Sequence, residues 1–132
     1  MTPKAKRNLF TAALWGGGIL LIICSLEAVL RYRFGFCDAP LSIESDRYEY
    51  IFAPNQNRHR FGNHIIYNSY SQRSQEPDSN KTIVLGLGDS VINGGVQTDH
   101  GDLATTIASN DTLQILNISA GSWGPDNCAA YL

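Results

Sequence analysis

The longest hydrophobic segment of the chain lies near its N-terminus. Residues 9–26 (LFTAALWGGGILLIICSL) carry no charge, and extending the segment to Leu30 adds only Glu27. As α-helices, the two versions span about 27 Å and about 33 Å, close to the thickness of a bilayer's hydrocarbon core. No polar face interrupts the segment, whereas a helix of a soluble core normally has one. The pattern predicts one transmembrane helix over residues 9–30, which would contact the lipid bilayer.

The residues that flank this segment bear on processing and orientation. Three basic residues precede it and two follow it: Lys4, Lys6, Arg7, Arg31 and Arg33. This difference favours a cytoplasmic N-terminus over residues 1–8 and a periplasmic or extracellular location for the bulk of the chain. The chain has no Ala-x-Ala site, and Ile23 precedes Cys24 where a lipoprotein signal has a small residue. An uncleaved signal-anchor is therefore favoured over a cleaved signal.

Residues 31–80 have the pattern of a polar, turn-rich extracytoplasmic connector. Short alternating segments at 48–52 and 64–67 are candidate strands, and residues 61–63 form a candidate turn. Residues 72–80 are expected to form an exposed loop.

Residues 81–132 alternate between strand and helix patterns. An apolar segment at 82–87 predicts a strand buried on both faces of a parallel sheet. A helix is expected over 102–109, a second strand over 113–118, and another helix beginning near Pro125. This order predicts an α/β fold with parallel strands joined by a right-handed crossover.

Composition and charge exclude several classes of protein. Apolar residues make up 43% of the 132 residues and charged residues 17%, which argues against a disordered chain. Residues 1–33 carry a net charge of +4 and the rest −6, so no basic stripe suggests nucleic-acid binding. Three cysteines cannot form a four-cysteine zinc site, and His59 and His64 lack carboxylate companions. We therefore expect no metal and no cofactor.

The candidate chemistry follows the first strand of the α/β segment. Gly88, Asp89 and Ser90 come directly after it, at the carboxyl end where open α/β sheets bind ligands, and Gly94 completes a Gly-Asp-Ser-x-x-x-Gly pattern. A serine there can present its hydroxyl to a cleft, beside backbone N–H groups that stabilise an oxyanion. The tripeptide is also common in ordinary turns. A second glycine-bearing turn, residues 117–125, follows the second strand.

These two segments resemble the first two sequence blocks of the SGNH or GDSL hydrolases, in particular their membrane-anchored members. The resemblance implies that Ser90 is the nucleophile and that Gly121 or Ser122 donates a backbone N–H to the oxyanion hole. Asp89 is expected to fix the loop through hydrogen bonds to backbone N–H groups. The implied fold is a partial flavodoxin-like, three-layer parallel sheet. The implied activity is hydrolysis or transfer of acyl esters, with lipids or acetylated glycans as substrates.

Two further blocks of that family are missing from these 132 residues. Asn110-Asp111 precedes the second block instead of following it, and no aspartate has a histidine three positions later. His100, between Asp99 and Asp102, is expected to be a solvated loop histidine. We therefore expect residues 81–132 to be the N-terminal portion of a truncated hydrolase domain that is inactive alone. The alternative is a non-catalytic, membrane-tethered binding module, or a degenerate remnant that uses the same cleft.

Overall fold

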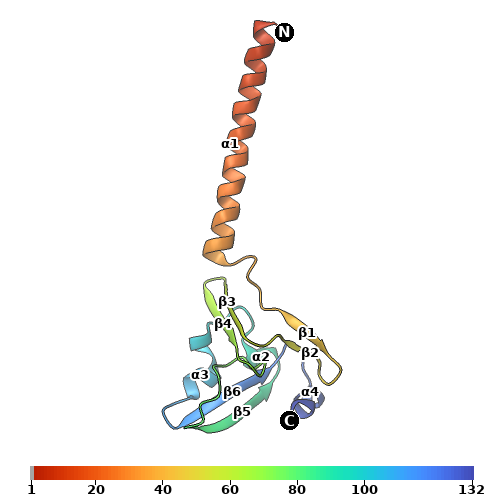
Figure 1. Ribbon diagram of the computed structural model, residues 1–132, viewed down its shortest axis with the longest axis vertical. Helices are drawn as coiled ribbons and strands as arrows, with labels where there is room; N and C mark the ends of the chain where they lie inside the picture. Colours follow the sequence, from red (N-terminus) through yellow and green to blue (C-terminus); the bar gives the residue numbers. More distant parts are fainter. Residues whose placement is uncertain (1) are drawn as a thin grey trace.

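The computed structural model describes residues 2–132, and its most extended element is the N-terminal helix α1 (Pro3–Phe34). This helix projects away from a mixed α/β body formed by the rest of the chain (Figure 1). The hydroxyl of Thr2 caps its start by accepting from Ala5 N at 3.3 Å. Its end is closed by Gly35 at φ 64°, with the Phe36 N–H bonded to the carbonyl of Leu30. The predicted span 9–30 lies inside a longer helix.

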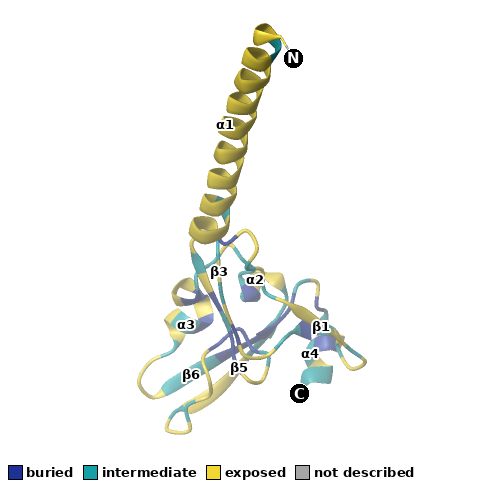
Figure 2. Ribbon diagram, turned by 45° about the horizontal axis from the view of Figure 1, so that its top comes forward, coloured by how far each residue is buried: buried dark blue, intermediate teal, exposed yellow. Residues whose placement is uncertain are grey.

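The length and composition of α1 make it a candidate membrane-spanning helix. Its most apolar 18-residue window has a mean hydropathy of 2.1, and none of that window is buried. Figure 2 shows the helix exposed along nearly its whole length. A helix of 32 residues is about 48 Å long, which exceeds the thickness of a bilayer's hydrocarbon core.

Two antiparallel hairpins follow α1. The first pairs β1 (Ser42–Ser45) with β2 (Glu49–Phe52), and the second pairs β3 (Gln56–Arg60) with β4 (Asn63–Tyr67). Phe61 and Gly62 connect β3 to β4 with φ values of 53° and 85°. Two consecutive positive φ values are typical of the tight turn that matches strand twist. The strands and the turn predicted within residues 48–67 are therefore present.

The parallel strand pair predicted for the second half is also present. Strand β5 (Thr82–Gly88) pairs in parallel with β6 (Leu113–Ser119). Three short helical elements connect them: α2 (Ser90–Asn93), the 3-10 helix η1 (His100–Asp102) and α3 (Ala104–Ala108). Helix α4 (Pro125–Tyr131) follows β6. The helix expected over 102–109 is shorter than predicted because Leu103, in an extended conformation, separates η1 from α3.

Strand β5 is less buried than predicted, whereas β6 is buried over its second half. Leu116 and Ile118 of β6 are buried, but Ile83, Val84 and Leu85 of β5 are 37%, 44% and 42% exposed. Within the described residues β5 pairs only with β6, so its other edge is open. The prediction that this strand is buried on both faces is therefore wrong for the described residues, because few of their side chains cover the faces of β5.

The main hydrophobic cluster joins the first hairpin to the end of β6. It contains Ile51, Ile118, Ala120 and Trp123, and the Trp123 indole N–H donates to the carbonyl of Tyr50 at 3.0 Å. The segment expected to be a connector thus contributes to the core of the α/β body. Its polar composition concealed this role, because a few aromatic and branched residues suffice to attach a two-stranded hairpin.

Candidate active site

The parallel register brings the two candidate loops to the same edge of the sheet. Gly88, the last residue of β5, lies opposite Ser119, the last residue of β6. Ser90 follows one strand end by two residues, and Gly121 follows the other by two residues. Both turns therefore leave the carboxyl edge of the strand pair side by side, as expected for ligand sites of α/β sheets.

Ser90 begins helix α2 and is exposed to solvent. The residue before it, Asp89, is the N-cap: its Oδ1 accepts from the N–H of Val91 at 2.9 Å. The Asp89 carbonyl accepts from Asn93 N at 3.1 Å, which closes the first turn. Asp89 thus holds the turn that presents the Ser90 hydroxyl. Because the N–H of Val91 is used by this cap, it is not available to an oxyanion.

Gly88 and Gly94 are required by close packing at the two ends of this turn. A Cβ atom on Gly88 would lie 2.6 Å from Cγ2 of Ile92, inside van der Waals contact. Gly94 ends α2 in the left-handed region at φ 71°, and a Cβ there would lie 2.8 Å from Cδ2 of Leu103. The spacing of the two glycines is therefore explained by the compact strand–turn–helix geometry around Ser90.

The second turn leaves backbone N–H groups free. Gly121 is half-buried, with the Tyr50 hydroxyl 3.4 Å from where a Cβ would sit, and Ser122 is exposed at φ 62°. Trp123 N donates to the carbonyl of Ala120 across the turn at 3.4 Å. Within the described part of the chain, neither the Gly121 nor the Ser122 N–H is used in a hydrogen bond. Both N–H groups are therefore free donors at this edge of the sheet.

A buried amide network that sequence reasoning missed ties α2 to β6. Asn93 Nδ2 donates to the Ser119 carbonyl at 2.9 Å, and Asn117 Nδ2 donates to the Ile92 carbonyl at 2.6 Å. The Ser119 hydroxyl bonds to Asn117 Oδ1. All three polar side chains are nearly inaccessible to solvent. Polar residues at inward positions of an otherwise apolar strand were the signal that could have revealed this network.

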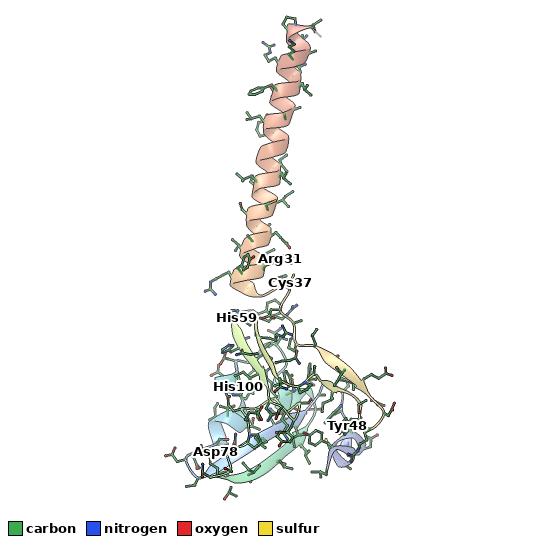
Figure 3. The ribbon with its side chains drawn as sticks, viewed as in Figure 1. Arg31, Cys37, Tyr48, His59, Asp78 and His100 are labelled. Atoms are coloured by element: carbon green, nitrogen blue, oxygen red, sulfur yellow. The ribbon has the colours of Figure 1, made fainter. Side chains whose placement is uncertain are left out.

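Within the described residues, no hydrogen bond joins Ser90 to any of the three histidines. His59 and His64 lie opposite each other on the second hairpin. His100 is only 8% exposed, so the expectation of a solvated loop histidine is wrong. The reason is the buried side chain of Arg73. It donates from Nη2 to the Thr98 carbonyl at 2.8 Å and so holds the loop that precedes His100 against the body. His59 lies near the end of α1 and His100 within the α/β body (Figure 3).

The electrostatic surroundings of His100 follow from this burial. Its Nε2 lies 3.3 Å from Nε2 of Gln75, and its Nδ1 has no partner among the described atoms. Burial lowers the pKa of His100 below its usual value, and the Arg73 guanidinium lowers it further. The folded state therefore favours the neutral ring of His100, and its side-chain contact is with Gln75 rather than with Ser90. No group of three or more metal-ligating side chains occurs among residues 2–132.

A cavity of about 310 Å³ lies elsewhere in the body. His100, Ser74, Lys81 and Ser109 contribute to its walls, whereas Ser90, Gly121 and Ser122 do not. The Ser90 hydroxyl therefore does not face this cavity, and Ser90 is exposed to solvent.

Comparison with known proteins identifies no relative: no family model matches the chain, and neither does any curated protein or solved structure. The class of protein is therefore described by its architecture alone. It is a mixed α/β chain with a long apolar N-terminal helix and a parallel strand pair. A capped serine turn and a glycine turn share the carboxyl edge of that pair.

Proposed function

We propose that the chain is the anchored N-terminal part of a serine ester hydrolase of the SGNH/GDSL type that acts at the cell envelope. The observation that carries this proposal is the register of Gly88 opposite Ser119, which brings the Ser90 turn and the Gly121 turn to one edge. The capped, exposed serine and the unused N–H groups beside it supply the chemistry.

In the proposed reaction, the Ser90 hydroxyl oxygen attacks the carbonyl carbon of an acyl ester. The hydroxyl proton passes to a base and then to the departing alcohol, and water later releases the acyl group from the serine. The N–H groups of Ser90 and of Gly121 or Ser122 stabilise the tetrahedral oxyanion. Since His59, His64 and His100 lie elsewhere, the proposal requires a base, an Asp–His pair, from outside these 132 residues. We propose that this chain alone is inactive.

The open edge of β5 supports the flavodoxin-like part of the proposal. In the strand order 2-1-3-4-5, the first strand lies between the second and the third. With β5 as the first strand and β6 as the second, a third strand would pair with the edge of β5 that is free here. In such a fold, helices on the faces of the sheet would cover the exposed side chains of Ile83, Val84 and Leu85.

Anchoring is proposed to occur through α1, with the N-terminus in the cytoplasm and the α/β body in the periplasm or outside the cell. The length and hydropathy of α1 support a span. The excess of basic residues before the apolar segment supports the orientation. The envelope location places the body beside acyl lipids and acetylated glycans, which are the proposed substrates.

The test uses a serine-directed fluorophosphonate probe and short acyl esters. The chain of 132 residues should label weakly or not at all, since loss of a general base costs on the order of 10² to 10⁴ in rate. A chain extended in the coding frame through an Asp-x-x-His should label strongly and hydrolyse the esters. Ser90→Ala should abolish both signals, whereas Ser122→Ala should preserve them because only its backbone N–H is used. Full esterase activity of the extended Ser90→Ala chain would refute the assignment of Ser90 as the nucleophile.

The alternative function is that of a non-catalytic, membrane-tethered binding module. The engagement of His100 with Gln75 rather than Ser90 favours this alternative. It predicts that an extended chain shows no Ser90-dependent labelling yet binds a glycan or a protein at the same edge.

A further inference from the structure

The tip of the second hairpin is bonded directly to the end of α1. Phe61 N donates to the carbonyl of Phe34, the last residue of the helix, at 2.7 Å. The backbones also approach closely at Gly35, where a Cβ would lie only 1.8 Å from the His59 carbonyl oxygen. Figure 1 shows β3 and β4 pointing toward the end of α1. The hairpin tip is therefore held against the helix end.

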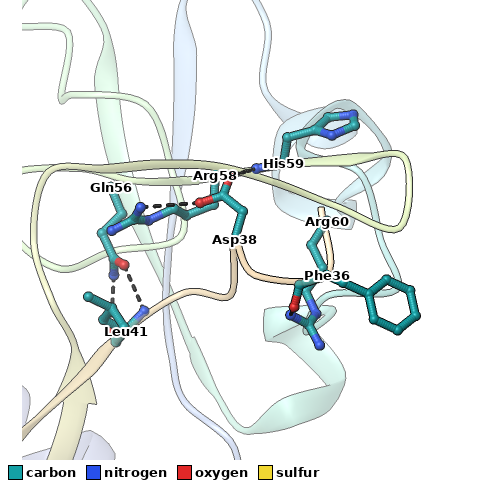
Figure 4. A network of polar contacts seen from close by, with 7 residues as sticks. All are labelled: Phe36, Asp38, Leu41, Gln56, Arg58, His59 and Arg60. Carbon is teal, nitrogen blue, oxygen red and sulfur yellow. Dashed lines mark hydrogen bonds and ion pairs between the residues drawn. The ribbon is translucent and has the colours of Figure 1, made fainter. Parts of the chain in front are cut away.

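The segment between α1 and β1 reinforces this attachment. Asp38 accepts from Arg58 Nη1 at 3.2 Å and from His59 N at 2.7 Å. The side chain of Gln56 bonds to both the N–H and the carbonyl of Leu41, at 2.7 and 2.9 Å (Figure 4). The segment between α1 and β1 is thus hydrogen-bonded to β3. The α/β body is therefore not joined to α1 by a flexible linker alone.

Aromatic and cationic side chains are exposed around this junction. The rings of Phe36 and Phe61 are in edge-to-face contact with centroids 5.5 Å apart, yet the residues are 48% and 39% exposed. The Arg60 guanidinium lies 4.7 Å above the Phe61 ring and donates to the Phe36 carbonyl at 2.9 Å. Within residues 2–132, Arg33 and Arg60 form no ion pair with a carboxylate. We call Arg33, Phe36, Arg60 and Phe61 the juxtamembrane surface.

The depth of this surface follows from helix geometry. From Leu30, the end of the predicted span, to Phe34 the helix rises about 6 Å. Each polar headgroup layer of a bilayer is about 5–8 Å thick. The carbonyl of Phe34, and the hairpin tip bonded to it, thus lie at the level of the headgroups.

We propose that the juxtamembrane surface binds the anionic phospholipid headgroups of the bilayer that α1 spans, which rests on the proposed anchoring. A guanidinium has five N–H donors in a planar fork, and Arg60 uses one on Phe36, which leaves others for phosphate oxygens. Phenyl rings beside them suit the layer between water and hydrocarbon. The hairpin, far from α1 in sequence, becomes a second membrane contact that fixes the orientation of the α/β body.

The experiment measures how close the hairpin tip lies to lipid headgroups. The full chain is reconstituted into vesicles of phosphatidylcholine, or of phosphatidylcholine with phosphatidylglycerol, each containing a headgroup-nitroxide lipid that quenches fluorescence. One dye is attached through His59→Cys, and a reference dye through Asp46→Cys on the other hairpin. Both are made in a background that lacks the native cysteines: Cys24→Ser, Cys37→Ser and Cys128→Ser.

Quenching at position 59 should be stronger in anionic than in neutral vesicles and should weaken at high salt. Each of Arg33→Gln and Arg60→Gln should shift the equilibrium away from the bound tip about fivefold. Arg47→Gln is the matched control, because Arg47 also lies over a ring, that of Tyr48, but on the first hairpin. It should change nothing, and the dye at position 46 should respond to none of these changes.

Equal quenching at position 59 in neutral and anionic vesicles, with both arginine variants unchanged, would overturn the proposal. Vesicle flotation in the same samples separates this result from failure of the anchor. If the chain floats with vesicles after a carbonate wash, α1 is inserted and only the headgroup proposal fails. If the chain does not float, the anchoring proposal fails and takes the headgroup proposal with it.

Discussion

Asn93, the last residue of α2, donates from Nδ2 to the carbonyl of Ser119, the last residue of β6, at 2.9 Å. This bond joins the turn that presents Ser90 to the strand that leads to Gly121. The Asn93 Oδ1 also accepts from the Tyr67 hydroxyl at 3.3 Å, which ties both elements to the second hairpin. One buried amide therefore sets the relative position of the two halves of the candidate site.

Asn93→Ala should destabilise the body strongly. It leaves the Ser119 carbonyl and the Tyr67 hydroxyl buried without this partner, and each unsatisfied group costs about 1–3 kcal/mol. Urea unfolding in detergent, followed by the fluorescence of buried Trp123, measures the loss. Asn57→Ala, at an exposed position of β3, is the control and should alter the unfolding free energy by less than about 0.5 kcal/mol. Equal effects of the two substitutions would contradict the role given to Asn93.

Gly94→Ala and Gly95→Ala form a second matched pair. Both glycines have positive φ, 71° and 53°, so alanine is strained by about 1 kcal/mol at either position. Only at Gly94 would the new Cβ meet neighbours, at 2.8 Å from Leu103 and 2.9 Å from Thr98. Overpacking adds about 1–3 kcal/mol there. Thermal unfolding in detergent should therefore show a clearly larger loss for Gly94→Ala, and identical melting temperatures would exclude a packing role.

The sequence was informative wherever structure depends on local periodicity. The alternation and apolar runs predicted β2, β4, β5 and β6, and their order predicted the parallel pair. It was uninformative about contacts between distant segments. Nothing in the local pattern shows that Ile51 packs with Ile118, or that β5 has an open edge in these residues.

For the candidate site too, the local features could be predicted and the contacts between distant segments could not. Strand–turn–helix order was enough to bring Ser90 and Gly121 to one edge of the sheet. The burial of His100 was missed, because it depends on Arg73 reaching Thr98 from a segment expected to be an exposed loop. The Asn93 network was missed because an asparagine at the end of a short helix is equally typical of a surface turn.

Membrane association should be hydrophobic rather than electrostatic. Because the apolar part of α1 is long enough to span a bilayer, the chain should stay with membranes through high salt and carbonate washes. A reporter fused after Leu132 should be active only outside the cytoplasm. Recovery in the soluble fraction would count against an uncleaved anchor, and cytoplasmic reporter activity would reverse the proposed orientation.

The open edge of β5 should make the α/β body prone to aggregate. A chain of residues 34–132 exposes Ile83, Val84 and Leu85 beside unpaired backbone groups, which can pair with another copy. Val84→Lys should raise its solubility, since a charge on an edge strand disfavours such pairing. Gln97→Lys adds the same charge away from β5 and should not help. If unsubstituted residues 34–132 formed a soluble monomer with a cooperative thermal transition, the open edge of β5 would not cause aggregation.

The last prediction concerns the acid sensitivity of the body and rests on the surroundings of His100. Its ring is packed near the Arg73 guanidinium, the Asp99 carboxylate and His64, and contacts the amide of Gln75. Burial first, and Arg73 second, lower the pKa of His100 below the unfolded value of 6.5, so the folded state favours the neutral ring. The nearby Asp99 has a lowered pKa as well, because its carboxylate accepts from the N–H groups of His64 and Gly101.

The direction of the pH dependence follows from the difference in proton binding between the folded and unfolded states. The folded state binds the His100 proton less readily than the unfolded state does. The contribution of neutral His100 to the unfolding free energy is therefore fully present above about pH 6.5. It falls as the pH drops toward the folded pKa, with a slope of at most about 1.4 kcal/mol per pH unit. Asp99 acts in the same direction but only below about pH 4, where its unfolded form takes up a proton. Urea midpoints measured in detergent from about pH 7 to about pH 5 should therefore decline, and His100→Gln should flatten that decline. His59→Gln, at an exposed position, should leave it intact. If the pH profile of His100→Gln ran parallel to that of the unaltered chain, the acid sensitivity would have to arise from a different group.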